Sequence, residues 1–315
     1  MNSTPVILDV DTGIDDAFAI LFAARHPLIN LLGVTCVDGN TNLDNVVANT
    51  LTVLDAADAG DIPVARGAAR PLLELPSYAE FVHGSDGMVE MQSKDSKRFL
   101  DPRTAIELMR DLINASPEPV TLVPIGPLTN IALFLRAFPD AASKLERIVL
   151  MGGSASVGNA TATAEFNIWH DPEAAKRVFA SGINTVMVGL DVTHSVKTYE
   201  HLWGWLKDGS KFGNAFDHIL TSYTNFYEMF YGERMTHQHD ALAMAEAIWP
   251  NIMELEPAFI DVECQGELTT GMTVTDTRLR NEVKPNGYVA WTIDGDDFHK
   301  KLMSALSKMS ADIGK

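Results

Sequence analysis

The chain has 315 residues, 46% of them hydrophobic, and it carries 24 basic against 42 acidic residues, a formal net charge of −18. This length and apolar content suffice for a substantial core, and since no linker or internal repeat interrupts the sequence we interpret residues 1–315 as one domain. The negative charge argues against nucleic acid or an anionic membrane surface as a partner, but it is no obstacle to a small uncharged substrate.

Cysteine usage and the N-terminal residues indicate the compartment. Cys36 and Cys264 are far apart and lack metal-binding spacing, which is typical of free thiols in a reducing environment. The chain passes directly into an apolar strand without the basic and apolar regions of a signal peptide. No stretch approaches the ~20 apolar residues of a membrane span. We therefore expect a cytoplasmic protein.

Strand-like and helical patterns alternate through the first two thirds of the chain. Mostly apolar runs of strand length are followed by segments of helical periodicity, which implies right-handed crossovers and a parallel sheet covered on both faces. The expected strands are 5–10, 29–37, 63–66, 120–125, 148–151 and 185–190. The expected helices are 15–24, 43–59, 102–114, 131–138 and one that begins near residue 172. The prediction is an α/β fold: an open, mostly parallel, Rossmann-like sheet flanked by helices.

Two long segments and the C-terminal third depart from this alternation. Residues 68–101, with several prolines and glycines, are expected to form a long functional loop, with or without a helical turn. A second long loop follows residue 153. Beyond it we expect helices 199–206, 216–231 and 241–249, short strands 258–262, 271–275 and 288–293, and a closing helix from about residue 297.

The stretch DVDTGIDDA, residues 9–17, concentrates four carboxylates in eight positions. Asp9 and Asp11 point to the same side of a strand that ends here. Asp15 and Asp16 begin the next helix, whose dipole accounts for one or two of the charges. The remaining pair would repel without a cation or a shared proton. Because all candidate ligands are oxygens, Ca²⁺ or Mg²⁺ fits better than Zn²⁺. A solvated, capped turn is the alternative.

Polar loops follow several of the expected strands. They come after residues 10, 37, 125, 151 and 190, and in an open parallel sheet ligands bind outside the carboxyl ends of the strands. These loops therefore gather at one edge of the sheet, and Asp240 joins them from a later helix. The sequence predicts a ligand site at this edge.

Five motifs in this order resemble those of the nucleoside hydrolases, the calcium-dependent N-ribohydrolases of the inosine-uridine preferring family. They are DVDTGIDDA, GPLTN at 126–130, MGG at 151–153, AEFN at 164–167 followed by DPE at 171–173, and HDA at 239–241. The resemblance covers most of the chain. It implies a nucleoside hydrolase fold and an enzyme of nucleoside salvage that cleaves the N-glycosidic bond of a ribonucleoside, releasing free base and ribose.

The resemblance also implies roles for individual residues. Calcium would be bound by Asp11, Asp16, Asp240 and the main-chain carbonyl of Ile125. Many relatives carry threonine in place of Ile125, so a hydroxyl contact would be missing while the carbonyl ligand remains. The residues expected to hold the ribose are Asp15, Asn40, Asn159, Glu165 and Asn167, and amides and carboxylates suit vicinal hydroxyls. Asp9 would orient the ligands.

The implied chemistry passes through a transition state that resembles an oxocarbenium ion. Calcium would hold the attacking water and the 2- and 3-hydroxyls of the ribose, with Asp11 as the general base. His239 is the candidate acid on the base side, because it precedes a metal ligand. His83 resembles a histidine of pyrimidine-accepting and nonspecific members. Either histidine is a candidate to protonate the leaving base, and a core or surface imidazole is the alternative for each.

Three aromatic residues near these motifs are interpreted as core packing. Tyr223 and Tyr227 lie four apart on an expected helix, a spacing more typical of a core than of a ligand site, although one of them could close over the base. Trp169, followed by His170, departs from the smaller or tyrosine-like residues of the family.

Two other functions remain open. A haloacid dehalogenase-like phosphotransferase also opens with an acidic turn and binds Mg²⁺, but it has no use for the AEFN and HDA motifs. A metal-stabilised nucleoside sensor without catalysis is the second alternative. His83, and the absence of tryptophan from residues 68–101, favour pyrimidine or broad base specificity. The family also implies a homodimer or homotetramer.

Overall fold

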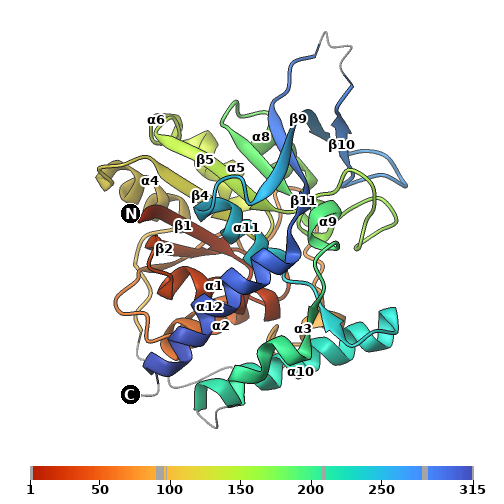
Figure 1. The fold of residues 1–315 in the computed structure, drawn as a ribbon. Helices are drawn as coiled ribbons and strands as arrows, with labels where there is room; N and C mark the ends of the chain where they lie inside the picture. Colours follow the sequence, from red (N-terminus) through yellow and green to blue (C-terminus); the bar gives the residue numbers. More distant parts are fainter. Residues whose placement is uncertain (1–2, 90–95, 97, 208–210, 279–282, 314–315) are drawn as a thin grey trace.

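A nine-stranded, mostly parallel sheet with helices on both faces forms the centre of the computed structural model, which describes residues 3–89, 96, 98–207, 211–278 and 283–313 (Figure 1). The strand order is β10-β9-β11-β6-β5-β4-β1-β2-β3. Strands from β3 to β11 pair in parallel, whereas β9 is antiparallel to both of its neighbours. The predicted α/β class and mostly parallel sheet are confirmed.

The strands of this sheet agree closely with the apolar runs of the sequence. They are β1 (Thr4–Val10), β2 (Ile29–Cys36), β3 (Val64–Arg66), β4 (Val120–Pro124), β5 (Leu145–Met151), β6 (Thr185–Val188), β9 (Met253–Val262), β10 (Thr273–Asp276) and β11 (Gly287–Ile293). Central strands β1 and β4 are buried along almost their whole length, as expected for strands with helices on both faces.

Two helical layers cover the sheet. One contains α1 (Ile14–Arg25), α2 (Leu43–Ala56), α11 (His239–Ile248) and α12 (Gly295–Ile313), with α10 (Lys211–Tyr231) and the 3₁₀ helix η1 (Glu200–Leu206) packed outside them. The other contains α4 (Ala105–Ala115), α5 (Thr129–Ala137), α6 (Pro139–Ala142) and α8 (Pro172–Phe179). Each layer encloses its own apolar core. Burial of side chains such as Phe18 and Phe134 stabilises the fold by roughly 2 kcal/mol each.

Several short elements were not predicted. They are α6, α7 (Phe166–His170), α9 (Leu190–Thr193) and the two-residue strands β7 (Thr198–Tyr199) and β8 (Met235–Thr236), whereas α3 (Glu80–His83) is a helical turn of the kind left open for residues 68–101. None is long enough to produce a periodic pattern. The predicted strand 258–262 is too short, because β9 begins at Met253; charged residues and Pro257 interrupt its apolar alternation. Residues 90–95 and 97 of the predicted loop 68–101 lie outside the described residues.

The chain reverses its direction of winding between β1 and β4. From β1 the sheet grows through β2 and β3 on one side and through β4, β5 and β6 on the other. In open α/β sheets such a switch point opens a crevice at the carboxyl ends of the strands. The predicted site loops all leave the sheet at this edge.

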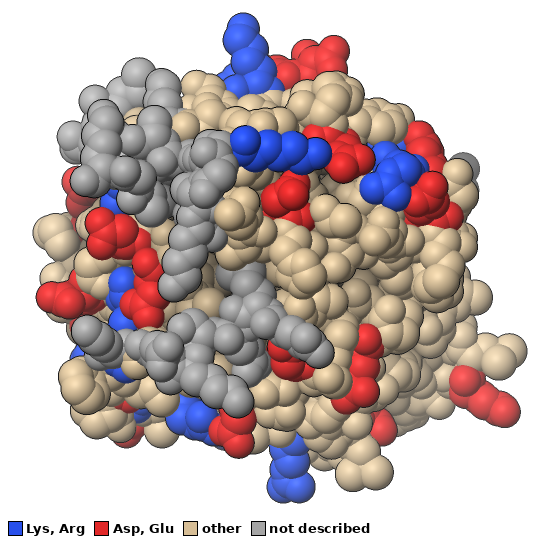
Figure 2. All heavy atoms as spheres, turned by 90° about the horizontal axis from the view of Figure 1, so that it is seen from below, with Lys and Arg blue, Asp and Glu red and all other residues tan. Residues whose placement is uncertain are grey.

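The surface carries mixed charge. On the face in Figure 2, Lys and Arg side chains stand apart from one another, several beside Asp or Glu, and no continuous basic area lies among the described residues of that face. In the described part of the chain, no helix combines the length and the apolar character that a membrane crossing requires.

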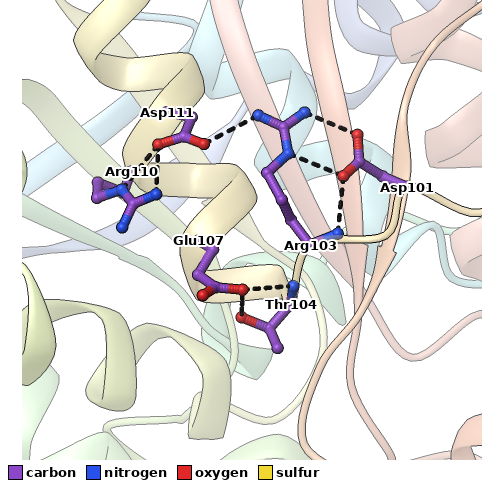
Figure 3. A network of polar contacts seen from close by, with 6 residues as sticks. All are labelled: Asp101, Arg103, Thr104, Glu107, Arg110 and Asp111. Carbon is purple, nitrogen blue, oxygen red and sulfur yellow. Dashed lines mark hydrogen bonds and ion pairs between the residues drawn. The ribbon is translucent and has the colours of Figure 1, made fainter.

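Helix α4 begins three residues later than predicted because a polar network fixes its start (Figure 3). The Glu107 carboxylate accepts hydrogen bonds from the main-chain N–H and the hydroxyl of Thr104, at 2.9 and 2.8 Å. Arg103 lies 2.7 Å from Asp101 and 3.1 Å from Asp111. These ion pairs are partly exposed, so they stabilise the fold little. The Thr104–Glu107 cap is the stronger determinant.

We predict that Thr104→Ala lowers the free energy of unfolding by about 1 kcal/mol, because the first turn of α4 loses its cap. Urea denaturation measures this difference. Thr104→Ser keeps the hydroxyl and should differ little from the parent protein. An unchanged stability in Thr104→Ala would contradict the assigned role of the cap.

Candidate active site

The turn between β1 and α1 carries the first group of acidic side chains. Asp16 lies in the first turn of α1, and its Oδ2 accepts a hydrogen bond from the N–H of Gly13 at 2.9 Å. The same oxygen accepts from the side-chain amide of Asn40 at 3.2 Å. Asp16 therefore caps the helix with one oxygen, and its buried Oδ1 has no hydrogen-bond partner among the described residues.

Asp11 lies between two glycines that follow other strands. Its Oδ2 accepts a hydrogen bond from the main-chain N–H of Asn40 at 2.8 Å. A Cβ atom on Gly39 or Gly126 would lie within 2.8 Å of Asp11 side-chain atoms. Glycine is required at both positions because any side chain would collide with this carboxylate. The glycine of the GPLTN motif thus makes room for Asp11.

Carboxylates from distant parts of the chain meet at this turn. Ligand oxygens of Asp15, Asp16 and Asp240 lie within 4.8 Å of one another, and all three residues are buried. Asp240 lies in the first turn of α11. The structure places Asp15 in this group, whereas the family resemblance implies a sugar contact for Asp15 and a ligand role for Asp11. Asp11 lies beside the group, close enough to raise the pKa of Asp240.

Burial and mutual repulsion raise the pKa values of these carboxyl groups. Desolvation, followed by the charge of Asp16, raises the pKa of Asp15 from 3.8 to about 7. Desolvation raises the pKa of Asp16 to about 6, and the pKa values of Asp11 and Asp240 lie well above their ordinary value for the same reason. A bound cation would reverse these shifts, since it favours the ionised forms.

The donor set suits a hard divalent cation. The buried oxygen of Asp16 lacks a partner, and the carboxylates that surround it are all oxygen donors. The main-chain carbonyl of Ile125 follows β4 at the same edge and accepts one hydrogen bond, from the Asn167 amide at 2.9 Å. A carbonyl oxygen has two lone pairs, so one remains for a cation. Oxygen donors of this kind fit Ca²⁺ or Mg²⁺.

Asp9 lies one layer below this group. Its Oδ1 accepts hydrogen bonds from the hydroxyl of Thr35 and from the Asn130 amide, the latter at 2.8 Å. Asn130, the last residue of GPLTN, also donates to the carbonyl of Cys36 and accepts from the N–H of Ala68. Burial raises the pKa of Asp9 to about 7. Asp9 therefore ties β1 and β2 to the GPLTN helix.

A pocket of about 570 Å³ opens above the carboxylates. Nine residues that the sequence singled out line it: Asp15, Asn40, His83, Ile125, Asn159, Glu165, Asn167, His239 and Asp240. Asp11 and Asp16 are not part of the lining; both lie behind it and contact Asn40. Trp169 lines the pocket as well, whereas His170 is buried. The structure thus brings together residues from both halves of the chain.

The AEFN motif builds one wall of the pocket. Glu165 caps the short helix α7, because its carboxylate accepts from the main-chain N–H groups of Asn167, Ile168 and Gly153. Burial raises the pKa of Glu165 to about 7. Asn159 fixes the start of the same helix by accepting from the N–H of Phe166 at 2.9 Å.

The two candidate histidines have different surroundings. The Nδ1 atom of His83 accepts a hydrogen bond from the main-chain N–H of Ile14 at 3.1 Å, which leaves its hydrogen on Nε2. Burial lowers the pKa of His83 to about 3 and that of His239 well below its usual range. Both imidazoles are therefore neutral.

A chain of polar groups links His239 to two tyrosines. Nδ1 of His239 lies 2.8 Å from the hydroxyl of Thr193, and Nε2 lies 3.2 Å from the hydroxyl of Tyr227. The Tyr227 hydroxyl lies 3.5 Å from that of Tyr223. Both tyrosines line the pocket, so the interpretation of this pair as core packing is incomplete. Their spacing along α10 gave no signal that distinguishes a buried hydroxyl chain from a packed core.

Comparison with known proteins gives consistent matches. A family model described as inosine-uridine preferring nucleoside hydrolase matches residues 6–300. The chain is 42% identical over 298 residues to the non-specific ribonucleoside hydrolase RihC of Salmonella agona (strain SL483), which covers 95% of this chain and 96% of the relative. It is 41% identical over 306 residues to the protein of that name from Escherichia fergusonii, with 97% and 99% covered.

Solved structures give the same result. A plant nucleoside hydrolase, PpNRh1, matches with a TM-score of 0.90 and 31% identity over 96% of this chain and 99% of that one. A purine-preferring ribonucleoside hydrolase from Gardnerella vaginalis matches with a TM-score of 0.92 and 30% identity, with 98% and 99% covered.

We predict that stabilisation by a divalent cation increases with pH. Without a cation, carboxyl groups with raised pKa values make the fold less stable as pH rises from about 4 towards 7, since ionisation is easier in the unfolded chain. A cation competes with these protons. At a free concentration about 100 times its Kd at pH 8, the cation should raise Tm by roughly 5 °C at pH 8, and the same concentration should raise it far less at pH 5. Thermal denaturation with Ca²⁺ or a chelator measures both values.

A charge-matched pair of variants controls this experiment. Asp240→Asn should lose most of the Tm increase, whereas Asp140→Asn, an exposed acid remote from the group, should keep it. An equal increase at both pH values, or one retained in Asp240→Asn, would contradict the assigned cation site.

Proposed function

Because the chain belongs to the inosine-uridine preferring nucleoside hydrolase family, we propose that it hydrolyses the N-glycosidic bond of ribonucleosides to free base and ribose. The observation that carries this proposal is the arrangement of the pocket. Buried carboxylates line the pocket together with a chain of imidazole and phenol groups. The family match also removes the support for a phosphotransferase.

The carboxylates of the pocket suit the charge that develops during this reaction. Cleavage of the bond between ribose and base passes through a transition state with positive charge on the sugar ring. Asp15, Glu165 and Asp240 line the pocket, and carboxylates fixed there before the reaction stabilise that charge without reorganising.

We propose Ca²⁺ as the cofactor, held by Asp11, Asp16, Asp240 and the carbonyl of Ile125, with Asp15 beside them. The donor set of buried carboxylate and carbonyl oxygens supports this choice. When bound, the cation supplies Lewis acidity, which lowers the pKa of a nearby water.

We propose Asp11 as the general base that accepts a proton from the attacking water. Its Oδ2 is held by the Asn40 N–H, which fixes the plane of the carboxylate. Burial and the charge of Asp16 raise the pKa of Asp11 well above the ordinary range, and a bound cation would reverse this shift. The ionised carboxylate is the form that can accept a proton from water, so the role of Asp11 as base is supported by its position beside the proposed cation site.

The ribose would lie against five polar residues of the pocket lining: Asp15, Asn40, Asn159, Glu165 and Asn167. Several are already fixed by hydrogen bonds to main-chain groups, so little side-chain freedom is lost when a sugar binds. A rigid, polar floor of this kind favours one orientation of the ring.

The departing base would receive its proton from the imidazole and phenol groups that line the pocket. Tyr227 connects Tyr223 to His239, so a proton given up by one tyrosine can be replaced along the chain. His83 presents an N–H to the same pocket, because its Nδ1 accepts from Ile14. Because burial keeps both imidazoles uncharged, the proton would come from a neutral N–H or O–H group.

We propose broad base specificity. The relatives named above are described as non-specific in two cases and as purine-preferring in one. In this chain aromatic side chains at the pocket mouth, Phe81, Phe226 and Phe230, offer faces on which purines and pyrimidines both stack. Direct comparison of substrates tests this point.

The first experiment measures reducing sugar released from uridine and inosine. We expect turnover of both, loss of activity with a chelator and recovery with Ca²⁺. Asp11→Ala should lower kcat by a factor of about 10²–10⁴, the range for a general base, while leaving the fold intact by circular dichroism.

Other results would revise the proposal. Tight nucleoside binding without turnover would support a sensor in place of an enzyme. Near-normal activity in Asp11→Ala would overturn its role as the base, and activity unaffected by the chelator would overturn the cofactor.

We further predict that Tyr227→Phe lowers kcat for inosine by a factor of roughly 10–100, because it breaks the path between Tyr223 and His239. Hydrolysis of 4-nitrophenyl riboside should change little, since nitrophenolate departs without a proton. Steady-state kinetics compare the two substrates. Tyr231→Phe, a pocket residue stacked on Tyr227, serves as the matched control. Equal losses for both substrates would contradict proton delivery by this chain.

A further inference from the structure

His170 is a buried histidine outside the pocket that the proposed chemistry does not use. It is the last residue of α7 and is 3% exposed. Its Nδ1 lies 3.1 Å from the main-chain carbonyl oxygen of Ser77, and its Nε2 lies 3.2 Å from Oδ2 of Asp38. The ring also packs against Phe166, with 5.6 Å between centroids. One imidazole thus joins three segments.

The partners of His170 fix where its hydrogens lie. A carbonyl oxygen can only accept, so Nδ1 carries a hydrogen that it donates to Ser77. Nε2 then faces the Asp38 carboxylate, and a contact at 3.2 Å between two lone pairs would be repulsive. A second hydrogen therefore lies between Nε2 and Oδ2. Both ring nitrogens are engaged, and this fixes the orientation of the ring.

The segment that His170 holds forms part of the pocket wall. Ser77, Tyr78 and Ala79 line the pocket, and the N–H of Ala79 donates to the carbonyl of Asn40 at 3.1 Å. The next residue, Asp171, fastens the same segment further back, because its Oδ2 accepts from the N–H of Leu72 at 2.9 Å. Consecutive residues of the α7–α8 junction therefore hold residues 72–79.

Asp38 connects the contacts of His170 to the acidic site. It precedes Gly39 and Asn40. The main-chain N–H of Asn40 donates to Asp11, and its side-chain amide donates to Asp16. Asp38 is fully buried, its Oδ1 has no partner among the described residues, and its Oδ2 is in contact with His170. Without His170 this buried carboxyl group would lose a hydrogen-bond partner, which is unfavourable.

We propose that His170 is a positioning residue which, through Ser77 and Asp38, holds residues 72–79 as the wall of the nucleoside pocket and aligns that wall with Asn40. This inference rests on the proposed function for the identity of the ligand. The contacts of His170 do not depend on it.

The first test is the proton distribution on the ring. In the full-length protein labelled with ¹⁵N-histidine, NMR should show His170 with a hydrogen on Nδ1, and Asp38→Asn should shift the Nε2 resonance. A spectrum with Nδ1 unprotonated would overturn the proposal, because the contact to Ser77 could not then exist.

Substitution separates positioning from general stability. His170→Phe keeps the ring that packs on Phe166 but removes both polar contacts. It should raise KM for uridine and inosine roughly tenfold while kcat changes by less than about threefold, because a displaced wall weakens ground-state and transition-state binding alike. His170→Asn places an amide near the position of Nδ1 and should restore part of the loss. His201→Phe, at an exposed histidine, is the matched control.

Two further measurements complete the test. The double variant of His170→Phe with Asp38→Asn should have a KM no higher than that of His170→Phe alone, since the two residues act through one contact. Amide exchange at Leu72 and Ala79 should be about tenfold faster in His170→Phe. A lower Tm with unchanged KM and unchanged exchange would overturn the proposal.

Failure of the proposed function would give a different result. If the parent protein turned over no ribonucleoside, the reaction would be in doubt, but the NMR and exchange measurements would still test the positioning of residues 72–79.

Discussion

Repulsion among buried carboxylates is the constraint on which the rest of this structure depends. Asp11, Asp15, Asp16 and Asp240 meet at the switch point of the sheet, where burial and mutual charge raise their pKa values. Neighbouring main-chain N–H groups and the Asn40 amide offset part of this cost. This cluster is unfavourable by itself and persists because the surrounding fold determines its geometry. A cation bound among the carboxylates would offset their repulsion, which favours its binding to the folded protein.

The surrounding layers consist of side chains that each join distant segments. Asp9 and Asn130 connect β1, β2 and the start of α5, Glu165 joins α7 to the end of β5, and His170 joins α7 to the loop after β3. Each uses most of its polar atoms in fixed contacts, so the pocket wall is built with little remaining side-chain freedom. Rigid support of this kind keeps reacting groups in place.

The sequence predicted the fold and most of the candidate site for identifiable physical reasons. Central strands are apolar because they are covered on both faces, and glycine-rich loops follow them at one edge, so the pattern indicates both the sheet and the crevice. Strand β9 was predicted too short because Glu254, Glu256 and Pro257 interrupt its alternation. The Tyr223–Tyr227–His239 chain and the Asp38–His170 pair were missed, since each depends on contacts between residues whose sequence patterns are equally typical of a packed core.

The hydrogen bonds of Asn167 determine which atom of its side chain is free to contact the proposed ribose. Both hydrogens of its amide nitrogen are donated to main-chain carbonyls, those of Ile125 and Met151. The amide is therefore locked in one orientation, and towards a ligand it offers only its oxygen. A partner group must bring its own hydrogen, as a hydroxyl does. Ethers and fluorine substituents lack that hydrogen, and their lone pairs would face those of the amide oxygen, so in the proposed complex the orientation of a single amide would select for free hydroxyl groups.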